Sequence, residues 1–146
     1  MYDPINRAVA AVHAGWKGTV LHISQGVIDA MQQEFGTQAP DLRVVIGPAI
    51  GPDSFQVGEE VVGKFKESGF PMEEIWSFRG PGDGSPMSGG HHIDLFKANR
   101  WLLEEAGVTA GNIQEYGIDT YTTDEYFSAR REGLECGRII NAIMLK

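Results

Sequence analysis

Apolar residues recur at intervals of three and four in one long stretch near the start of the chain. The residues are Val20, Ile23, Val27, Ile28, Met31 and Phe35. This spacing is typical of a helix that buries one face. Gly18 or Thr19 stands near its start, and Gly36 follows it where a C-cap is expected. We therefore predict a helix that begins near Thr19 and ends at Phe35.

Two later stretches predict shorter helices. Residues 58–67 carry acidic side chains early and lysines late, in agreement with the helix dipole. Asp94 is placed to cap a second helix that runs to Ala106, and Gly107 closes it. Its inward positions are expected to be Leu95, Ala98, Leu102 and Ala106.

The rest of the chain is β-leaning or rich in glycine and proline. Residues 5–13 follow a turn-like YDPIN and predict a strand, whose hairpin partner is expected before residue 1. Further strands are predicted at residues 42–47, 112–122, 126–132 and 137–145, the last of them hairpin-like. Residues 79–90 contain five glycines and two prolines and predict a long surface loop.

These elements indicate an α+β domain of mixed α/β layers, in which amphipathic helices pack on a mixed β-sheet. The length of 146 residues fits one domain, and an apolar content of 42% favours a globular chain over a disordered one. The net charge of −8 argues against binding to nucleic acid or to an anionic membrane, because both require a basic face.

The absence of targeting segments and the low cysteine content indicate a cytoplasmic location. No apolar stretch reaches the roughly 18 residues of a membrane span. The start of the chain lacks the basic and apolar regions of a signal peptide. A single cysteine, Cys136, excludes an internal disulfide and fits a reducing compartment. We therefore expect a cytoplasmic protein.

His13 stands at the end of the first predicted strand, before the small-residue turn Ala14-Gly15. It is either a ring packed at the strand end with one backbone hydrogen bond or a metal ligand. A zinc site needs three or four ligands, and His22, nine residues later, does not lie at a recurring ligand interval. The spacing alone favours the packed ring.

Other candidate groups favour structural interpretations. His91 and His92 are sequence neighbours that point in different directions, and we expect them at a solvated loop end. Cys136 is expected to be a small unreactive thiol in a turn. The chain contains no G-x-S-x-G elbow, and its glycine-rich loop lacks the Gly-Lys-Ser/Thr ending of a phosphate loop.

The stretch FSARRE places two arginines side by side in an acidic chain. If it is extended, Ser128 and Arg130 share one face, whereas Arg131 lies on the other. Adjacent arginines can clamp an anion such as phosphate, or they can pair with internal carboxylates. The residues alone leave both interpretations open.

Four stretches, in this order, resemble the YfiH/laccase-domain family: AAVHAGWKGT, GPAIGPDSFQVGEEV, HIDLFKANRWLLEEAGV and DTYTTDEYFSARRE followed by GR. The resemblance runs from Tyr2 to the last predicted strand and implies a YfiH-like fold. Members of this family were once called multicopper polyphenol oxidases and are now regarded as purine nucleoside phosphorylases.

The resemblance also implies a metal centre of zinc, with copper as an alternative. In the family two histidines and one cysteine hold the metal, and His13 matches one of these histidines. The other two ligands have no counterpart, and Cys136 does not lie at the ligand position. Residues 1–146 are therefore expected to form a single YfiH-like domain that lacks the N-terminal part of the family fold. Asp119 stands where relatives commonly have the cysteine of a Cys-Thr-Tyr pattern.

The implied activity is phosphorolysis of adenosine, inosine, guanosine or methylthioadenosine, together with deamination of adenosine. The implied partners are a purine nucleoside and phosphate. From the acidic charge and the lack of a long apolar stretch, we expect no nucleic acid and no membrane as partners. We expect Arg130 and Arg131, with Ser128, to form the catalytic anion site. The expected substrate-binding residues are Gly47, Ile50, Gly51, Asp94 and Asn99.

Two alternatives remain open. The first is a non-catalytic or partner-dependent relative of the family that has no competent metal site. The second is a copper-dependent polyphenol oxidase. The oxidase is disfavoured because four histidines and one remote cysteine do not supply its ligand cluster. If the N-terminal part is missing, an uncovered sheet edge or apolar face predicts self-association.

Overall fold

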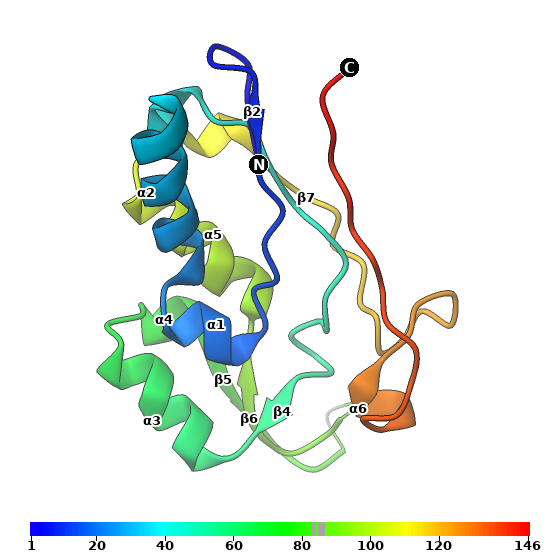
Figure 1. Cartoon of the computed structure of the whole chain (residues 1–146). Helices are drawn as coiled ribbons and strands as arrows, with labels where there is room; N and C mark the ends of the chain where they lie inside the picture. The colour runs from blue at the N-terminus through cyan, green and yellow to red at the C-terminus, as the bar shows by residue number, and fades with distance from the viewer. Residues whose placement is uncertain (83, 85–86) are drawn as a thin grey trace. The chain divides into compact units, whose positions relative to one another are not determined.

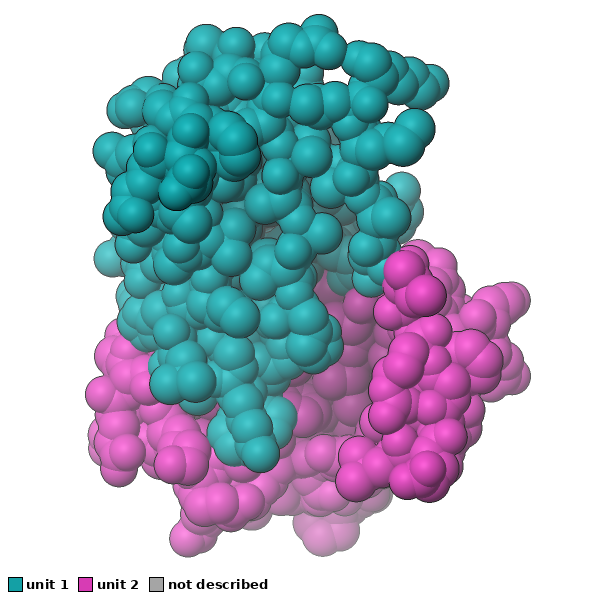
Figure 2. Space-filling view, viewed as in Figure 1, with its two compact units in different colours: residues 1–47, 99–116, 141–146 teal, residues 48–98, 117–140 magenta. Residues whose placement is uncertain are grey.

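The computed structural model describes residues 1–82, 84 and 87–146 of the chain (Figure 1). Asp83, Ser85 and Pro86, which belong to the predicted glycine-rich loop, lie outside the described residues. The chain forms two compact units (Figure 2). Unit 1 comprises residues 1–47, 99–116 and 141–146, and unit 2 comprises residues 48–98 and 117–140. Helices and small sheets occur in both, so the predicted mixed α/β class is confirmed.

Unit 1 combines two small sheets with helices. Strands β1 (Tyr2–Asp3) and β2 (Ala8–Val9) pair antiparallel, and β3 (Val44–Ile46) pairs in parallel with β7 (Ile113–Glu115). Its helices include α1 (Trp16–Val20), α2 (Ile23–Phe35) and the short 3₁₀ turns Ala39–Asp41 and Ala110–Asn112. The buried core consists of Ala8, Ile28, Met31, Leu42, Val44, Leu103, Val108 and Ile113.

The first hairpin is tied together by a buried aspartate at its turn. Asp3 Oδ1 accepts hydrogen bonds from the backbone N–H groups of Ile5 (2.8 Å) and Asn6 (3.0 Å), and Oδ2 accepts one from Asn6 Nδ2 (2.9 Å). Arg7 completes the turn with a left-handed backbone, at φ 51°. The expectation that the partner strand precedes residue 1 was wrong, because Tyr2–Asp3 is that strand.

The hydrogen bonds around Asp3 also change its acidity. Burial alone would raise the pKa of this carboxyl, but the Thr37 hydroxyl and the hydrogen bonds from Asn6 and Ile5 lower it from 3.8 to about 2. The Thr37 hydroxyl approaches the carboxylate without the regular hydrogen-bond geometry that the other donors meet. Asp3 is therefore held as a carboxylate at neutral pH.

Unit 2 is built on a three-stranded antiparallel sheet in the order β4 (Gln56–Val57), β6 (Gly90–Ile93), β5 (Trp76–Arg79). Helices α3 (Glu59–Glu67), α4 (Met72–Ile75) and α6 (Ala129–Glu132) also belong to it. Helix α5 (Leu95–Glu105) begins in unit 2 and continues in unit 1. Buried apolar residues of unit 2 include Phe55, Val61, Phe65, Phe70, Ile75, Ile93, Leu95 and Phe96.

The predicted helices are confirmed, with one difference. Gly36 ends α2 at φ 72°, and Asp94 caps α5 by accepting a hydrogen bond from Lys97 N at 3.0 Å. The first long helix is divided into α1 and α2, because His22 adopts a left-handed backbone at φ 55°. Periodicity does not show this break, since the apolar spacing continues across it.

The predicted strands of the final third were largely wrong. Residues 126–132 contain the helical turn α6, where Arg131 N donates to Ser128 O at 3.0 Å. Residues 137–145 have no regular secondary structure. Near the start of the chain, the predicted strand over residues 5–13 is also much shorter than expected, because only Ala8–Val9 is a strand. A strand needs a hydrogen-bonded neighbour, which an apolar pattern does not supply. Strands β5 and β6 and helix α4 were not predicted.

No helix in the described part of the chain combines the length and apolar character needed to cross a membrane.

Candidate functional site

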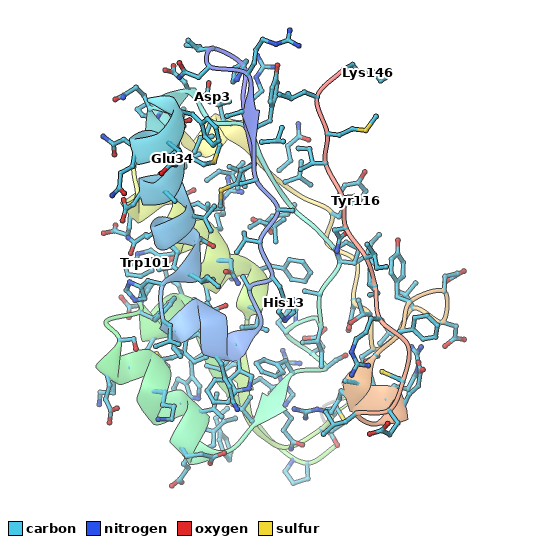
Figure 3. The ribbon with its side chains drawn as sticks, viewed as in Figure 1. Asp3, His13, Glu34, Trp101, Tyr116 and Lys146 are labelled. Carbon is cyan, nitrogen blue, oxygen red and sulfur yellow. The ribbon has the colours of Figure 1, made fainter. Side chains whose placement is uncertain are left out.

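His13 lies in unit 1 on the irregular segment between β2 and α1 (Figure 3). The residue is exposed. The ring folds over the backbone of the turn that follows it. A Cβ at Gly15 would lie 3.1 Å from His13 Nε2, which is tighter than most real contacts. Glycine at position 15 thus allows the imidazole to pack against the main chain.

The turn after His13 is held by two buried polar side chains from different helices of unit 1. Thr19 Oγ1 in α1 lies 3.2 Å from the Ala14 carbonyl and 3.1 Å from the Gly15 carbonyl. Asn99 Nδ2 in α5 donates to Thr19 Oγ1 at 3.1 Å. Asn99 was predicted to bind substrate, and the structure places it behind the turn that carries His13. Thr19 was missed, because its partner is distant in the sequence.

A metal centre would need donors besides His13. Among the residues that the structure describes, no group of three or more His, Cys, Asp or Glu side chains could hold a metal ion. His22 Nδ1 contacts Gln25 Oε1 at 3.0 Å, and Arg138 Nη1 lies 3.5 Å from Cys136 Sγ. The described donors therefore do not fit a complete zinc or copper site, and His13 is a single candidate ligand.

The two adjacent histidines are not at a solvated loop end, because both lie on strand β6. His92 is buried, with Nδ1 3.0 Å from the Pro52 carbonyl and Nε2 3.3 Å from the Gly89 carbonyl. His91 accepts a hydrogen bond at Nδ1 from Trp76 Nε1 (3.1 Å) and stacks on that indole. The strand directs them to opposite faces, as expected for sequence neighbours.

Residues Ala129–Glu132 form a helical turn with Ser128 as the N-cap, so the face assignment, which was made for an extended segment, does not apply. Ser128 is buried at the start of α6. Arg131 Nη1 donates to the carbonyls of Tyr121 (2.9 Å) and Thr120 (3.1 Å). Arg131 Nη2 donates to the carbonyl of Tyr126 (2.6 Å). Arg131 thus binds the segment that precedes it.

Arg130 is exposed and belongs to the same helical turn. Its Nη1 donates to the Gln56 carbonyl at the start of β4 (2.8 Å). The guanidinium carbon lies 5.7 Å from the ring centroid of Phe55, within the range of a cation–π interaction. The two adjacent arginines therefore have different surroundings: Arg131 faces carbonyl oxygens, and Arg130 lies over an aromatic ring.

The loop after residue 47 brings Gly51, Ser54 and Asp119 together within unit 2. Buried Ser54 donates from Oγ to Asp119 Oδ2 at 2.5 Å. A Cβ at Gly51 would lie 2.8 Å from the same carboxylate oxygen, so only glycine fits there without a shift. Asp119 Oδ1 also accepts a hydrogen bond from Tyr121 N at 2.8 Å. The carboxylate therefore joins this loop to the residues that follow Asp119.

The other predicted substrate residues are placed separately. Gly47 belongs to unit 1, where a Cβ would lie 3.5 Å from Asn141 Oδ1. Ile50 belongs to unit 2 and is partly buried, and Asp94 caps α5. Their roles toward a substrate remain predictions.

Known proteins similar to this chain carry two kinds of name. The chain is 44% identical over 146 residues to the purine nucleoside phosphorylase of Bacteroides thetaiotaomicron, covering 99% of the chain and 52% of that protein. It is 39% identical over 139 residues to an adenosine deaminase from an unknown prokaryotic organism, covering 94% of the chain and 50% of that protein. The chain thus spans about half the length of each of these two relatives.

The fold also matches a solved structure. The crystal structure of the Bacillus licheniformis hypothetical protein YfiH superposes with a TM-score of 0.77 at 32% sequence identity, covering 90% of this chain and 48% of that one. A family model described as multi-copper polyphenol oxidoreductase laccase matches residues 1–146. The chain therefore belongs to this laccase-like, YfiH-containing family.

Proposed function

We propose that this protein acts as a purine nucleoside phosphorylase, with deamination of adenosine as a second reaction. The observation that carries the proposal is the 44% identity to a relative named purine nucleoside phosphorylase over 99% of the chain. The relative named adenosine deaminase supports the second reaction. The preferred nucleoside is proposed to be adenosine, inosine, guanosine or methylthioadenosine.

Phosphorolysis needs a local cation on this acidic chain. An oxygen of inorganic phosphate attacks C1′ of the nucleoside, the bond from C1′ to the purine nitrogen breaks, and the departing base takes the electron pair and a proton. With adenosine, inosine or guanosine the products are ribose 1-phosphate and the free base, and with methylthioadenosine the sugar product is 5-methylthioribose 1-phosphate. Because the chain has a net charge of −8, the phosphate requires neighbouring positive groups to bind. The arginines of helix α6 are the proposed source of that charge.

The loop between Gly47 and Ser54 is proposed to supply neutral donors to the substrate. Within the described part of the chain, the backbone N–H groups of Ile50 and Gly51 have no protein acceptor, whereas those of Ala49 and Ser54 donate to carbonyls. Backbone N–H groups without a protein acceptor can bind oxygen atoms without adding charge. The contact of Ser54 with Asp119 holds this loop in place.

His13 is our candidate for one ligand of a zinc or copper ion, in keeping with the copper named in the family description. Its exposure and the support from Thr19 and Asn99 are compatible with this role. Because the described residues do not complete a metal site, we derive no step of the reaction through a metal.

The test is a pair of product assays on the purified chain. Hypoxanthine release from inosine should require phosphate and should produce an equal amount of ribose 1-phosphate. Inosine formation from adenosine should proceed without phosphate. Hypoxanthine release without ribose 1-phosphate would show hydrolysis and contradict phosphorolysis. Failure to form either product would favour the non-catalytic relative.

A further inference from the structure

We infer that Arg130, and not Arg131, binds the phosphate co-substrate, and that Arg131 is a positioning residue. The inference rests on the proposed phosphorolysis and specifies which arginine carries the anion. It follows from the different partners of the two guanidinium groups. On a helical turn, neighbouring residues point about 100° apart, so two adjacent arginines need not share one ligand.

The donors of Arg131 are occupied by the protein itself. Nη1 lies within hydrogen-bond distance of the carbonyls of Thr120, Tyr121 and Thr123, at 3.1, 2.9 and 3.3 Å. Nη2 donates to the Tyr126 carbonyl at 2.6 Å and to Glu132 Oε1 at 2.7 Å. A phosphate at this guanidinium would have to displace these acceptors. Arg131 therefore holds the segment from Thr120 to Tyr126 in its looped path.

Arg130 is fixed in position but retains donors. The hydrogen bond from Nη1 to Gln56 O and the Phe55 ring beneath the guanidinium limit its orientation. Within the described part of the chain, the edge formed by Nε and Nη2 meets no protein acceptor. Such an edge presents two parallel N–H groups, the geometry that matches two oxygens of a phosphate.

The structure around Arg130 also favours an anion over an internal carboxylate. In unit 2, Asp53 forms an ion pair with Arg79 at 2.5 Å, and Glu132 forms one with Arg131 at 2.7 Å. The described carboxylates make no ion pair with Arg130. Of the two interpretations of the adjacent arginines, internal pairing thus fits Arg131 and anion binding fits Arg130.

The experiment compares inorganic phosphate binding by the whole chain and its variants, using titration calorimetry and ³¹P line broadening. Arg130→Gln should weaken phosphate binding about tenfold or more, because a charge-assisted hydrogen bond is lost. Arg130→Lys should restore part of the affinity. Arg43→Gln is the matched control, since it removes one exposed positive charge of unit 1 and should leave phosphate affinity unchanged.

Kinetics and stability separate the two roles. In phosphorolysis, Arg130→Gln should raise the KM for phosphate about tenfold and the KM for inosine by much less. Arg131→Lys should lower the melting temperature, with phosphate affinity of the folded protein retained. Phosphate binding by Arg130→Gln equal to that of the natural chain, or no phosphate binding by the natural chain, would overturn the inference. If the natural chain binds phosphate through Arg130 without forming product, the proposed reaction fails and this assignment stands.

Discussion

Asn99 in helix α5 donates a hydrogen bond to the hydroxyl of Thr19 in helix α1 at 3.1 Å, and both side chains are buried. The hydroxyl in turn contacts the carbonyls of the Ala14-Gly15 turn. The backbone that positions His13 therefore depends on a polar contact between residues far apart in the sequence.

Thr19→Val should reduce the free energy of unfolding by about 1–3 kcal/mol, because it leaves the Asn99 amide buried without this acceptor. Urea unfolding measures the change. Adding Asn99→Leu to Thr19→Val should recover part of the loss, since both polar partners are then absent. Independent, additive effects of the two substitutions would contradict the contact.

Gly15→Ala should displace the His13 imidazole, because the new Cβ would lie 3.1 Å from Nε2. The free energy of unfolding should change by less than about 1 kcal/mol, since the backbone at this position suits any residue. The NMR signals of the His13 ring should shift. Gly26→Ala, with nothing within 4 Å of its new Cβ, is the control and should leave those signals in place.

Asp3→Asn should remove a pH-dependent part of the stability. Since the folded pKa of Asp3 is lowered to about 2 from 3.8, its contribution is present above pH 3.8 and disappears as the pH falls through about 2. Urea midpoints of the natural chain and the variant should therefore differ at pH 7 and converge near pH 2. A constant difference across this range would show that the carboxylate charge does not matter.

Gly51→Ala should destabilise the protein by about 1–3 kcal/mol, because the added methyl group overpacks a buried site. The nearest atom, Asp119 Oδ2, would be only 2.8 Å away, and the same oxygen accepts the Ser54 hydrogen bond. Gly63→Ala in helix α3, with nothing within 4 Å, should instead stabilise the chain by about 1 kcal/mol. Thermal melts of the two variants should shift in opposite directions.

The sequence predicted the helices well because their determinants are local. The spacing of apolar residues located α2, and acidic residues followed by lysines located α3. The cap Asp94 and the inward positions after it located α5, and the caps Asp94 and Gly36 each act within one turn of the helix they cap. The strands of the final third failed for the opposite reason. The path of residues 120–126 is set by Arg131, whose carbonyl partners no pattern of apolar residues identifies.

The candidate site was predicted unevenly for the same reason. Residue type and motif identified His13 and the adjacent arginines, yet they did not show that the two arginines have different partners. His92 was expected in solvent, but the antiparallel pairing of β6 with β4 and β5 buries it. Thr19 and Ser54 carried no sequence signal, because a buried hydroxyl gains its role only from its tertiary partner.

Neither compact unit is a continuous stretch of the chain. The core of unit 1 includes Leu103, Val108 and Ile113, and unit 2 includes residues 117–140. During synthesis on the ribosome, the early helices therefore emerge well before the residues that complete their core. The segment Met1–Gly47 of unit 1 must therefore avoid aggregation until residues 99–116 have been translated.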